Sequence, residues 1–401
     1  MNNKLISRTF LFSLISTFCF CFLYSWLGGG QISKMMVAFF AWCSYLAIPL
    51  PCFTSKYFDK KTCFVLSIFL FIIVIVLIKS LFFPTQSSPG NKILTLFGNP
   101  YCLLMMLVPI YIYMGNHKSS IRDVFSTVRL FLIYGFVFSF FYPKQYSAIV
   151  WFLPIFAPYI KKQYRLLAII VVIDTIYTGF FSENTYRTNI IVLALCFCSY
   201  IIARYIKRRS LITIFCCVTT IIPLFYAILS LMLPDFSIFQ YIAHHYLGGV
   251  SNVEMTEDTR TFLFRELAQD LSGSNNWLLG RGPDGQYFSA FFLESTSENA
   301  DHYMRLNSEV TFLMNLLRGG VMYTFCYYFL LFYSMFKILK YGKSRLMLCV
   351  ACIIATWIFV SALSMVHGIE ILEVLMFTLV GCGLSSYWLK ITDEEFYTLL
   401  K

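Results

Sequence analysis

The sequence predicts an all-α polytopic membrane protein with about 12 transmembrane helices. Of its 401 residues, 59% are hydrophobic and only 13% are charged, and the mean hydropathy is +0.71. Soluble globular proteins have about 45–50% apolar and about 25% charged residues, so a chain of this composition could not hide its apolar surface from water. The apolar run 64–78 (FVLSIFLFIIVIVLI) does not alternate with polar residues as the strands of a transmembrane barrel do. A water-soluble enzyme and an outer-membrane barrel are therefore both excluded.

Twelve apolar runs are candidates to cross a bilayer, which takes about 20 residues per helix. They fall at 9–27, 35–53, 63–83, 100–114, 124–142, 146–160, 166–181, 188–206, 211–233, 309–338, 346–366 and 369–388. Several are short or contain proline, so their ends are expected to shift by a few residues. The first run follows Lys4 and Arg8 without a convincing cleavage site, which favours a retained signal anchor.

The basic residues are distributed unevenly over the connections between these runs. With a cytoplasmic amino terminus, twenty of the 31 Lys and Arg residues lie on the inner side and ten on the outer side, while Arg129 lies within span five. This distribution obeys the positive-inside rule and predicts that both termini are cytoplasmic. The net charge of +11 is therefore interpreted mainly as a topology signal, and no nucleic-acid partner is expected.

One long connection, 234–308, lies between spans nine and ten of this single integral membrane domain (1–401). Long loops in compact proteins are usually functional. Two helix-like pieces are predicted in it, 256–272 and 287–294, with the turn NNWLLGRGPDG between them. All fourteen cysteines lie in or beside the apolar runs, so the loop has no disulfide framework. We expect an ordered outer cap that contains short helices.

The basic residues of this loop and its far edge are all arginine. They are Arg260, Arg265, Arg281, Arg305 and Arg318. A planar guanidinium binds phosphate oxygens in pairs, as a diphosphate ligand requires. The alternative is ion pairing with the eleven acidic residues between 235 and 309, and for any single arginine that alternative is the commoner outcome. As a set, the arginines favour phosphate binding.

Arg187 stands at the outer mouth of span eight. A cation at a helix start opposes the helix dipole, which favours an anion nearby, although a simple interface anchor is the alternative. Three further charges, Arg129, Asp174 and Glu373, lie within spans, and a transporter would need such charges. Without a repeat pattern, a structural role is the simpler interpretation.

Nothing in the sequence indicates a metal or cofactor site. GRGPDG (280–285) follows no parallel strand, so a tight turn is expected there rather than a dinucleotide site. His244 and His245 are adjacent and cannot share one helical face, and no DxD motif occurs. We expect a metal-independent protein without a cofactor.

The segment 301–324 (DHYMRLNSEVTFLMNLLRGGVMYT) is the most distinctive. Apolar residues recur at helical spacing from Val310, and Arg318-Gly319-Gly320 then interrupts the pattern. This predicts a half-buried helix at the outer surface, kinked into a full span. His302, Asn307 and Glu309 would lie at the mouth of the membrane domain.

Three stretches in this order resemble the O-antigen polymerase and ligase superfamily of bacterial inner membranes. They are SENTYRTNIIVLAL (182–195), DTRTFLFRELAQD to NNWLLGRGPDG (258–285) and LNSEVTFLMNLLRGGVMYTF (306–325), about a sixth of the chain. The resemblance implies a GT-C-like helical fold in the bacterial inner (cytoplasmic) membrane. It also implies glycosyl transfer between sugars carried on undecaprenyl pyrophosphate, at the periplasmic face.

Within this resemblance, the arginine before the span matches Arg187 and the arginine of the loop helix matches Arg260, with Arg265 one turn further. Many members have histidine where this chain has Asn307, which argues against the ligase branch. We therefore expect an O-antigen polymerase whose catalytic residues are Arg187, Arg260, Arg265, His302 and Glu309. Substrate binding is expected from Arg281, Arg305, Asn307 and Arg318.

The expected partners are undecaprenyl-pyrophosphate-linked oligosaccharides, membrane lipid and a chain-length regulator. Two alternatives stay open: a ligase that moves the finished glycan to lipid A-core, and a flippase or other transporter of lipid-linked oligosaccharide. A flippase would more often show internal two-fold repetition and short loops on both sides, and neither is evident in the sequence.

Overall fold

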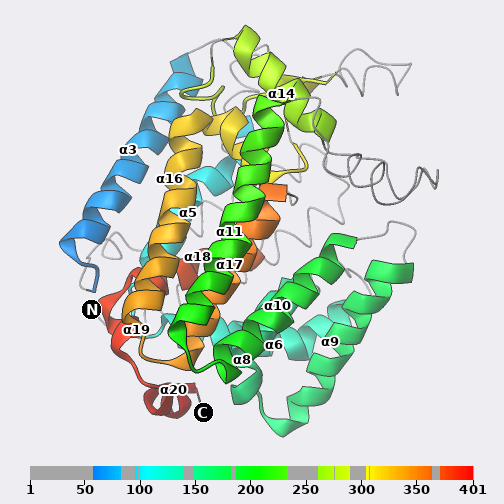
Figure 1. Cartoon of the computed structure of the whole chain (residues 1–401), viewed down its shortest axis with the longest axis vertical. Helices are drawn as coiled ribbons and strands as arrows, with labels where there is room; N and C mark the ends of the chain where they lie inside the picture. Colours follow the sequence, from blue (N-terminus) through cyan, green and yellow to red (C-terminus); the bar gives the residue numbers. More distant parts are fainter. Residues whose placement is uncertain are drawn as a thin grey trace.

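The computed structural model describes residues 57–82, 95–96, 100–139, 148–181, 187–233, 261–274, 276–289, 304–306, 308–363 and 371–400 (Figure 1). Its helices are α3 (Lys60–Phe82), α5 (Pro100–Met114), α6 (Ser120–Ser139), η2 (Ala148–Trp151), α8 (Leu153–Phe156), η3 (Ala157–Tyr159), α9 (Lys162–Phe181), α10 (Arg187–Tyr205), α11 (Arg209–Met232), α14 (Thr261–Gly273), α16 (Thr311–Tyr341), α17 (Arg345–Leu363), α18 (Ile371–Leu384), α19 (Ser386–Lys390) and α20 (Asp393–Leu400). Two short strands, β1 (Tyr287–Phe288) and β2 (Met304–Arg305), pair antiparallel. The predicted runs 9–27 and 35–53 lie outside the described residues.

In this part of the chain, four helices are long and apolar enough to cross a membrane: α3, α11, α16 and α17. Shorter apolar helices cover 104–114, 191–205 and 372–384. The protein is thus a helical membrane protein, as its composition predicts.

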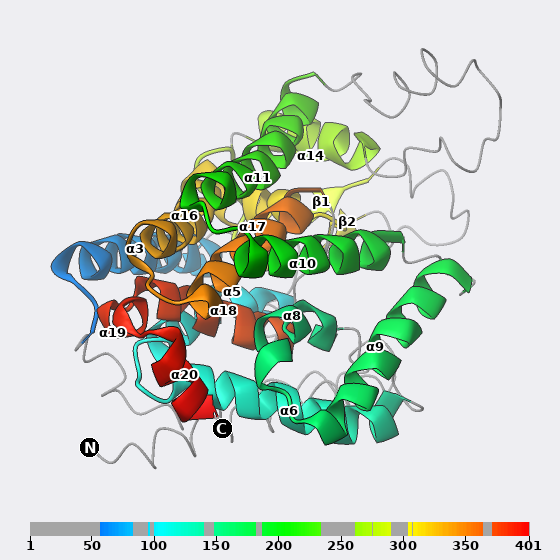
Figure 2. The same cartoon turned by 60° about the horizontal axis from the view of Figure 1, so that its bottom comes forward.

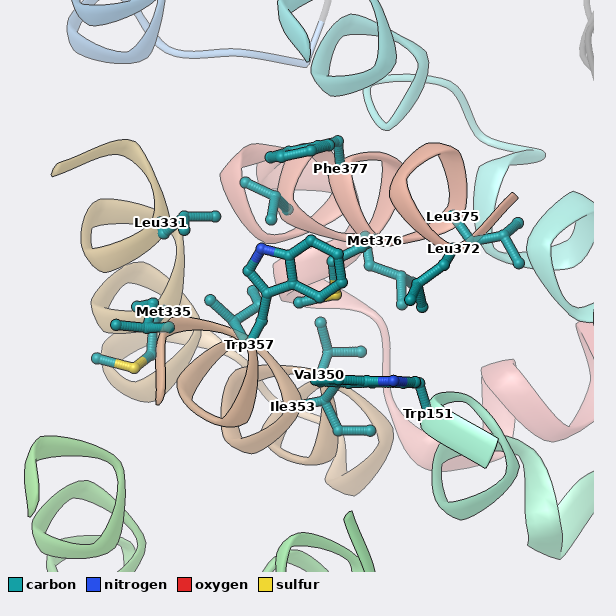
Figure 3. Close-up of a cluster of buried hydrophobic side chains, with 14 of the residues drawn as sticks. Trp151, Leu331, Met335, Val350, Ile353, Trp357, Leu372, Leu375, Met376 and Phe377 are labelled. Carbon is teal, nitrogen blue, oxygen red and sulfur yellow. The ribbon is translucent and has the colours of Figure 1, made fainter. Parts of the chain in front are cut away.

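The helix α17 lies at the centre of the described body, packed against α10, α11, α16 and α18 (Figure 2). Of its most apolar stretch, 89% is buried, against 33% for α3 and for α11, which expose apolar faces suited to lipid. Trp357 of α17 fills the core, with Phe377 of α18 at 6.1 Å and Trp151 of η2 at 5.4 Å between ring centroids (Figure 3). Its indole Nε1 donates to the hydroxyl of Tyr327 at 3.2 Å, so the polar edge of this buried ring is satisfied.

The apolar run 146–160 does not form the single helix expected for span six. Residues 148–159 form η2, α8 and η3 in succession, because Pro154 and Pro158 have no N–H to continue an α-helical ladder. The segment begins beside Trp357, and its last part lines a cavity with Arg345 at the start of α17. A broken connection, buried from Val150 to Phe156 and partly exposed in η3, therefore replaces the expected helix.

The described helices have two ends with different contacts. At one end, which we call the tail end, Lys337 Nζ contacts the carboxylate of Asp59 at 3.1 Å and the carbonyl of Leu384 at 2.9 Å. Arg345 also donates to the carbonyl of Ile206 at 2.7 Å there. The opposite end, the loop end, carries α14 and the start of α16 (Figure 1). Connections predicted to share a side thus meet at the same end.

The outer cap is partly as predicted. The helix α14 confirms the described part of the predicted piece 256–272. The prediction of a second helix at 287–294 is wrong for its described residues, because Tyr287 and Phe288 form β1. Burial alternates there, with Tyr287 and Ser289 buried and Phe288 exposed, which is the period of a strand.

Candidate functional site

A kink in α16 organises the loop end. Gly320 has φ 64° and ψ −167°, so the chain leaves the helix there and resumes it at once, which confirms the kink predicted at Arg318-Gly319-Gly320. A kink of this kind removes the helical partners of the carbonyls just before it and of the N–H groups just after it. Such groups need other partners because the kink is buried and shielded from water.

The turn predicted from NNWLLGRGPDG supplies those partners. Its N–H groups donate to the two orphaned carbonyls, and its carbonyls accept from the two orphaned N–H groups. The four bonds are Arg281 N to Leu317 O (2.7 Å), Gly282 N to Arg318 O (2.9 Å), Val321 N to Trp277 O (2.8 Å) and Met322 N to Leu278 O (3.2 Å). We call residues 276–285 and 317–322 together the glycine junction. Its four bonds join the turn to α16 through backbone groups alone.

Two glycines make this approach possible. Gly280 and Gly320 both have positive φ, 63° and 64°. A Cβ on Gly320 would lie 2.4 Å from the carbonyl of Leu278, and one on Gly280 would lie 2.5 Å from the carbonyl carbon of Arg318. Both distances are far below van der Waals contact. A side chain at either position would therefore push the turn away from residues 317–322.

Side chains from α3 and α5 hold the same turn. Lys79 Nζ donates to Asn276 Oδ1 at 2.7 Å and to the carbonyl of Gly280, and Ser80 Oγ donates to the carboxylate of Asp284. On α5, Cys102 Sγ donates to the carbonyl of Pro283 at 2.9 Å. The turn is therefore part of the helical body.

Arg281, expected to bind substrate, is engaged by the cap itself. Its guanidinium lies 2.9 Å from a carboxylate oxygen of Asp270 on α14 and donates to the carbonyl of Gln286 at 2.6 Å. Burial raises the pKa of the Asp270 carboxyl, and the nearby charge of Arg281 opposes that rise. Ion pairing, the alternative considered for each arginine, thus describes Arg281, which fixes α14 to the glycine junction.

Arg305 is engaged in a similar way. It pairs in register with Tyr287 across β1 and β2, and its guanidinium lies 3.8 Å from the carboxylate of Glu309. Burial raises the pKa of Tyr287 to about 12, an effect that Arg305 opposes. Ser289 next to this strand donates to Glu266 of α14 at 2.6 Å. Arg305 thus belongs to a polar cluster that joins the hairpin to α14, and the exposed Glu309 lies at its edge.

Arg318 belongs to the glycine junction through its carbonyl, and its side chain extends into the helical body. It is buried and lines a cavity of about 20 Å³ between α5 and α16, with Asn315, Tyr323 and Tyr327 among the other lining residues. A space of that size holds about one water molecule. The buried Glu373 of α18 interacts electrostatically with Tyr327. Polar side chains thus extend from the loop end into the core.

Two other predicted arginines can be placed. Arg265 is exposed on α14, which contacts α11 and α16 at the loop end. Arg187 begins α10, and the far end of that helix meets the start of α17 through Arg345 and the carbonyl of Ile206. The start of α10 therefore lies toward the loop end. Arg260, His302 and Asn307 lie outside the described residues.

Sequence reasoning missed several residues that build this end of the molecule. Lys79 is the last-turn cation of an apolar helix, a common position for an interface anchor, and nothing in the sequence indicates its contact with Asn276. Asp284 lies in the predicted turn, but its partner Ser80 is about two hundred positions away in the chain. Of the charges noted within spans, Glu373 is buried and Arg129 is exposed.

The described residues contain no group of three His, Cys, Asp or Glu side chains that could hold a metal ion. Among the described arginines of this end, Arg281 and Arg305 contact carboxylates and Arg318 is buried, while Arg265 is exposed on the anchored helix α14. Comparisons with models of protein families, with curated proteins and with solved structures each returned no match for this chain.

Proposed function

We propose that this protein is an O-antigen polymerase, a metal-independent glycosyltransferase of the bacterial inner membrane with a twelve-span, GT-C-like fold. One observation supports it above the others: α14, which bears Arg265, is fixed to the membrane helices through the Arg281–Asp270 pair and the glycine junction. An arginine on a helix anchored in this way has a defined position relative to the membrane helices. A defined position is what a catalytic phosphate contact requires.

In the proposed reaction, a hydroxyl of a newly flipped lipid-linked repeat unit attacks the anomeric carbon of the growing glycan. The bond from that carbon to the diphosphate oxygen breaks, and undecaprenyl pyrophosphate leaves with the bonding electron pair. The proton of the hydroxyl passes to a weak base, for which Glu309 and His302 are the candidates.

The diphosphate is already a good leaving group, so positioning and charge supply most of the catalysis. We assign this role to Arg187, Arg260 and Arg265. Arginine stays protonated and cannot act as the base. Arg281 and Arg305 hold the cap in place, and their contribution to binding is indirect.

The test uses a strain that lacks the chromosomal gene and carries variants of the full chain. Arg265→Ala and Arg187→Ala should each lower polymerisation by about 10²–10³-fold, seen as loss of the long ladder of lipopolysaccharide. Arg→Lys should be nearly as damaging, because a point charge loses the paired contacts of the guanidinium. Arg165→Ala, at an exposed cation near the start of α9, is the control and should leave the ladder intact. Full glycan length with Lys at positions 187, 260 and 265 would contradict the diphosphate contact.

The deletion strain separates the alternatives. Single-repeat caps on lipid A-core indicate a lost polymerase, which the proposal expects. Bare core with glycan stranded on the outward-facing carrier indicates a ligase. Bare core with little outward-facing oligosaccharide indicates a flippase.

A further inference from the structure

A second cavity lies at the tail end, away from every residue of the proposed glycosyl-transfer site. It has a volume of about 530 Å³, within the range of about 300–1,000 Å³ typical of ligand sites. Its walls come from α8 and η3, the end of α10, the start of α17, and α20. The lining residues used below are Tyr159, Tyr200, Arg204, Cys349, Glu394 and Tyr397.

Two side chains of opposite charge, Arg204 and Glu394, line this cavity and form no ion pair with each other in the described residues. Among the residues that the structure describes, neither the guanidinium of Arg204 nor the carboxylate of Glu394 makes a hydrogen bond or an ion pair, and both residues are exposed. The neighbouring charges are engaged. Asp393 accepts from the backbone N–H of Arg345 at 2.7 Å, and the side chain of Arg345 donates to the carbonyl of Ile206 at 2.7 Å.

Aromatic rings border the same space. Tyr159 and Tyr397 form a tilted pair with ring centroids 6.3 Å apart, and Tyr200 lies one helical turn before Arg204 on α10. The electron-rich faces of tyrosine rings attract ammonium groups.

The cavity becomes apolar away from the helix ends. Arg345 begins α17, and Leu346 and Cys349 follow within one turn, so the charges mark the surface and the apolar lining lies deeper. Lys337 and Arg345, two of the basic residues predicted to be cytoplasmic, lie at this end. A ligand with a polar head and an apolar part fits such a lining.

We propose that this cavity binds a zwitterionic phosphoethanolamine group, as carried by phosphatidylethanolamine in the inner leaflet. Arg204 binds the phosphate, and Glu394 binds the ammonium together with the rings of Tyr397 and Tyr159. The helix α20 forms one wall, so the bound lipid attaches the end of the chain to the membrane surface. The inference does not depend on the glycosyl-transfer proposal, because none of these residues belongs to that site.

The experiment uses the full chain, purified in detergent and stripped of lipid. Binding of dioleoyl-phosphatidylethanolamine is measured by native mass spectrometry and by the rise in melting temperature. Arg204→Gln and Glu394→Gln should each weaken binding by about tenfold or more, since each removes one charged contact. Arg208→Gln, at an exposed arginine that does not line the cavity, is the matched control and should bind as the parent does.

Two further ligands test whether the ammonium group is needed and whether the bound group is carried by a lipid or by a soluble molecule. Dioleoyl-phosphatidylglycerol, which lacks the ammonium, should bind at least about tenfold more weakly, and equal binding would overturn the proposal. Full competition by soluble glycerophosphoethanolamine at equal concentration would overturn the lipid as the occupant, because the acyl chains would then contribute nothing to binding. Unchanged phosphatidylethanolamine binding in both Gln variants, with unchanged melting temperatures without lipid, would also overturn the proposal.

Discussion

At the residue scale, Gly320 has the most constrained backbone at the loop end. Its φ and ψ fall in a region that is essentially restricted to glycine and that strains any other residue by about 1–3 kcal/mol. A side chain there would also collide with the carbonyl of Leu278. Two independent requirements, torsion and space, therefore select glycine at this position.

Gly320→Ala should consequently lower the melting temperature of the purified protein and its abundance in the membrane. The loss should exceed the torsional cost of about 1–3 kcal/mol, because the four bonds of the glycine junction are displaced as well. Gly273→Ala, at the end of α14, is the control, since a Cβ there meets nothing within 4 Å. An equal and small effect of both substitutions would contradict the constraint at Gly320.

The Arg281–Asp270 pair gives a prediction in pH. Burial raises the pKa of Asp270, so the folded state binds more protons than the unfolded chain, and the free energy of unfolding falls as the pH rises through the folded pKa. Arg281→Gln removes the charge that opposes this rise, so the pKa of Asp270 in the folded state should rise further. The loss of stability with rising pH should then be larger and extend to higher pH. The melting temperature of Arg281→Gln should therefore fall further below that of the parent at pH 7.5 than at pH 4.5.

Adding Asp270→Asn to Arg281→Gln provides the control, because it removes the titrating group. The double variant should recover much of the loss at pH 7.5 and lose the extra pH dependence. If the double variant is as pH-sensitive as Arg281→Gln, another group is responsible.

At the element scale, the sequence predicts helices well where an apolar run and helix-breaking residues determine their position and their kinks. The kink of α16 was predictable, because adjacent glycines after Arg318 interrupt an apolar helix. The strand at Tyr287 was mistaken for a helix because eight mostly apolar residues carry little periodicity, and β2 lies far along the chain. The partners of Arg281 and Arg305 were not predictable either, because any of the eleven acidic residues between 235 and 309 was a candidate.

The helix α20 begins with a capping box that can be tested separately. Glu395 Oε2 accepts from the N–H of Thr392 at 2.8 Å, and Thr392 Oγ1 accepts from the N–H of Glu395 at 3.4 Å. Thr392→Ala should cost about 0.5–2 kcal/mol and speed amide hydrogen exchange in 393–400. Thr398→Ala, which alters an exposed threonine within the same helix, should leave the exchange nearly unchanged.

At the scale of the whole molecule, composition and charge distribution predicted the helical membrane class. They also predicted which connections lie together, as the contacts of Lys337 and Arg345 at the tail end illustrate. The broken connection at 148–159 escaped prediction because its proline residues stand in an apolar run that has nearly the length of a span. Hydropathy reports how apolar a segment is, and most of this segment is buried without forming one helix.

The predicted sidedness can be tested with alkaline phosphatase, which is active only when exported. Fusions after Ser274 should be active and fusions after Lys343 inactive, since the two positions lie at opposite ends of the helices and the second lies among the inner cations. A β-galactosidase series at the same positions should give the reverse pattern. The opposite outcome at both positions would show that the predicted topology is inverted.

The backbone pairing at Gly320 also sets an order of biosynthesis. Ribosomes deliver the turn at 276–285 before the residues at 317–322 that complete its hydrogen bonds, so the cap cannot reach its final form while span ten is still being synthesised. Conversely, the freed N–H and carbonyl groups of α16 are satisfied only when the turn packs against the kink. The turn and the kinked helix therefore complete each other's hydrogen bonds, and a chain truncated before residue 317 leaves the turn without these partners.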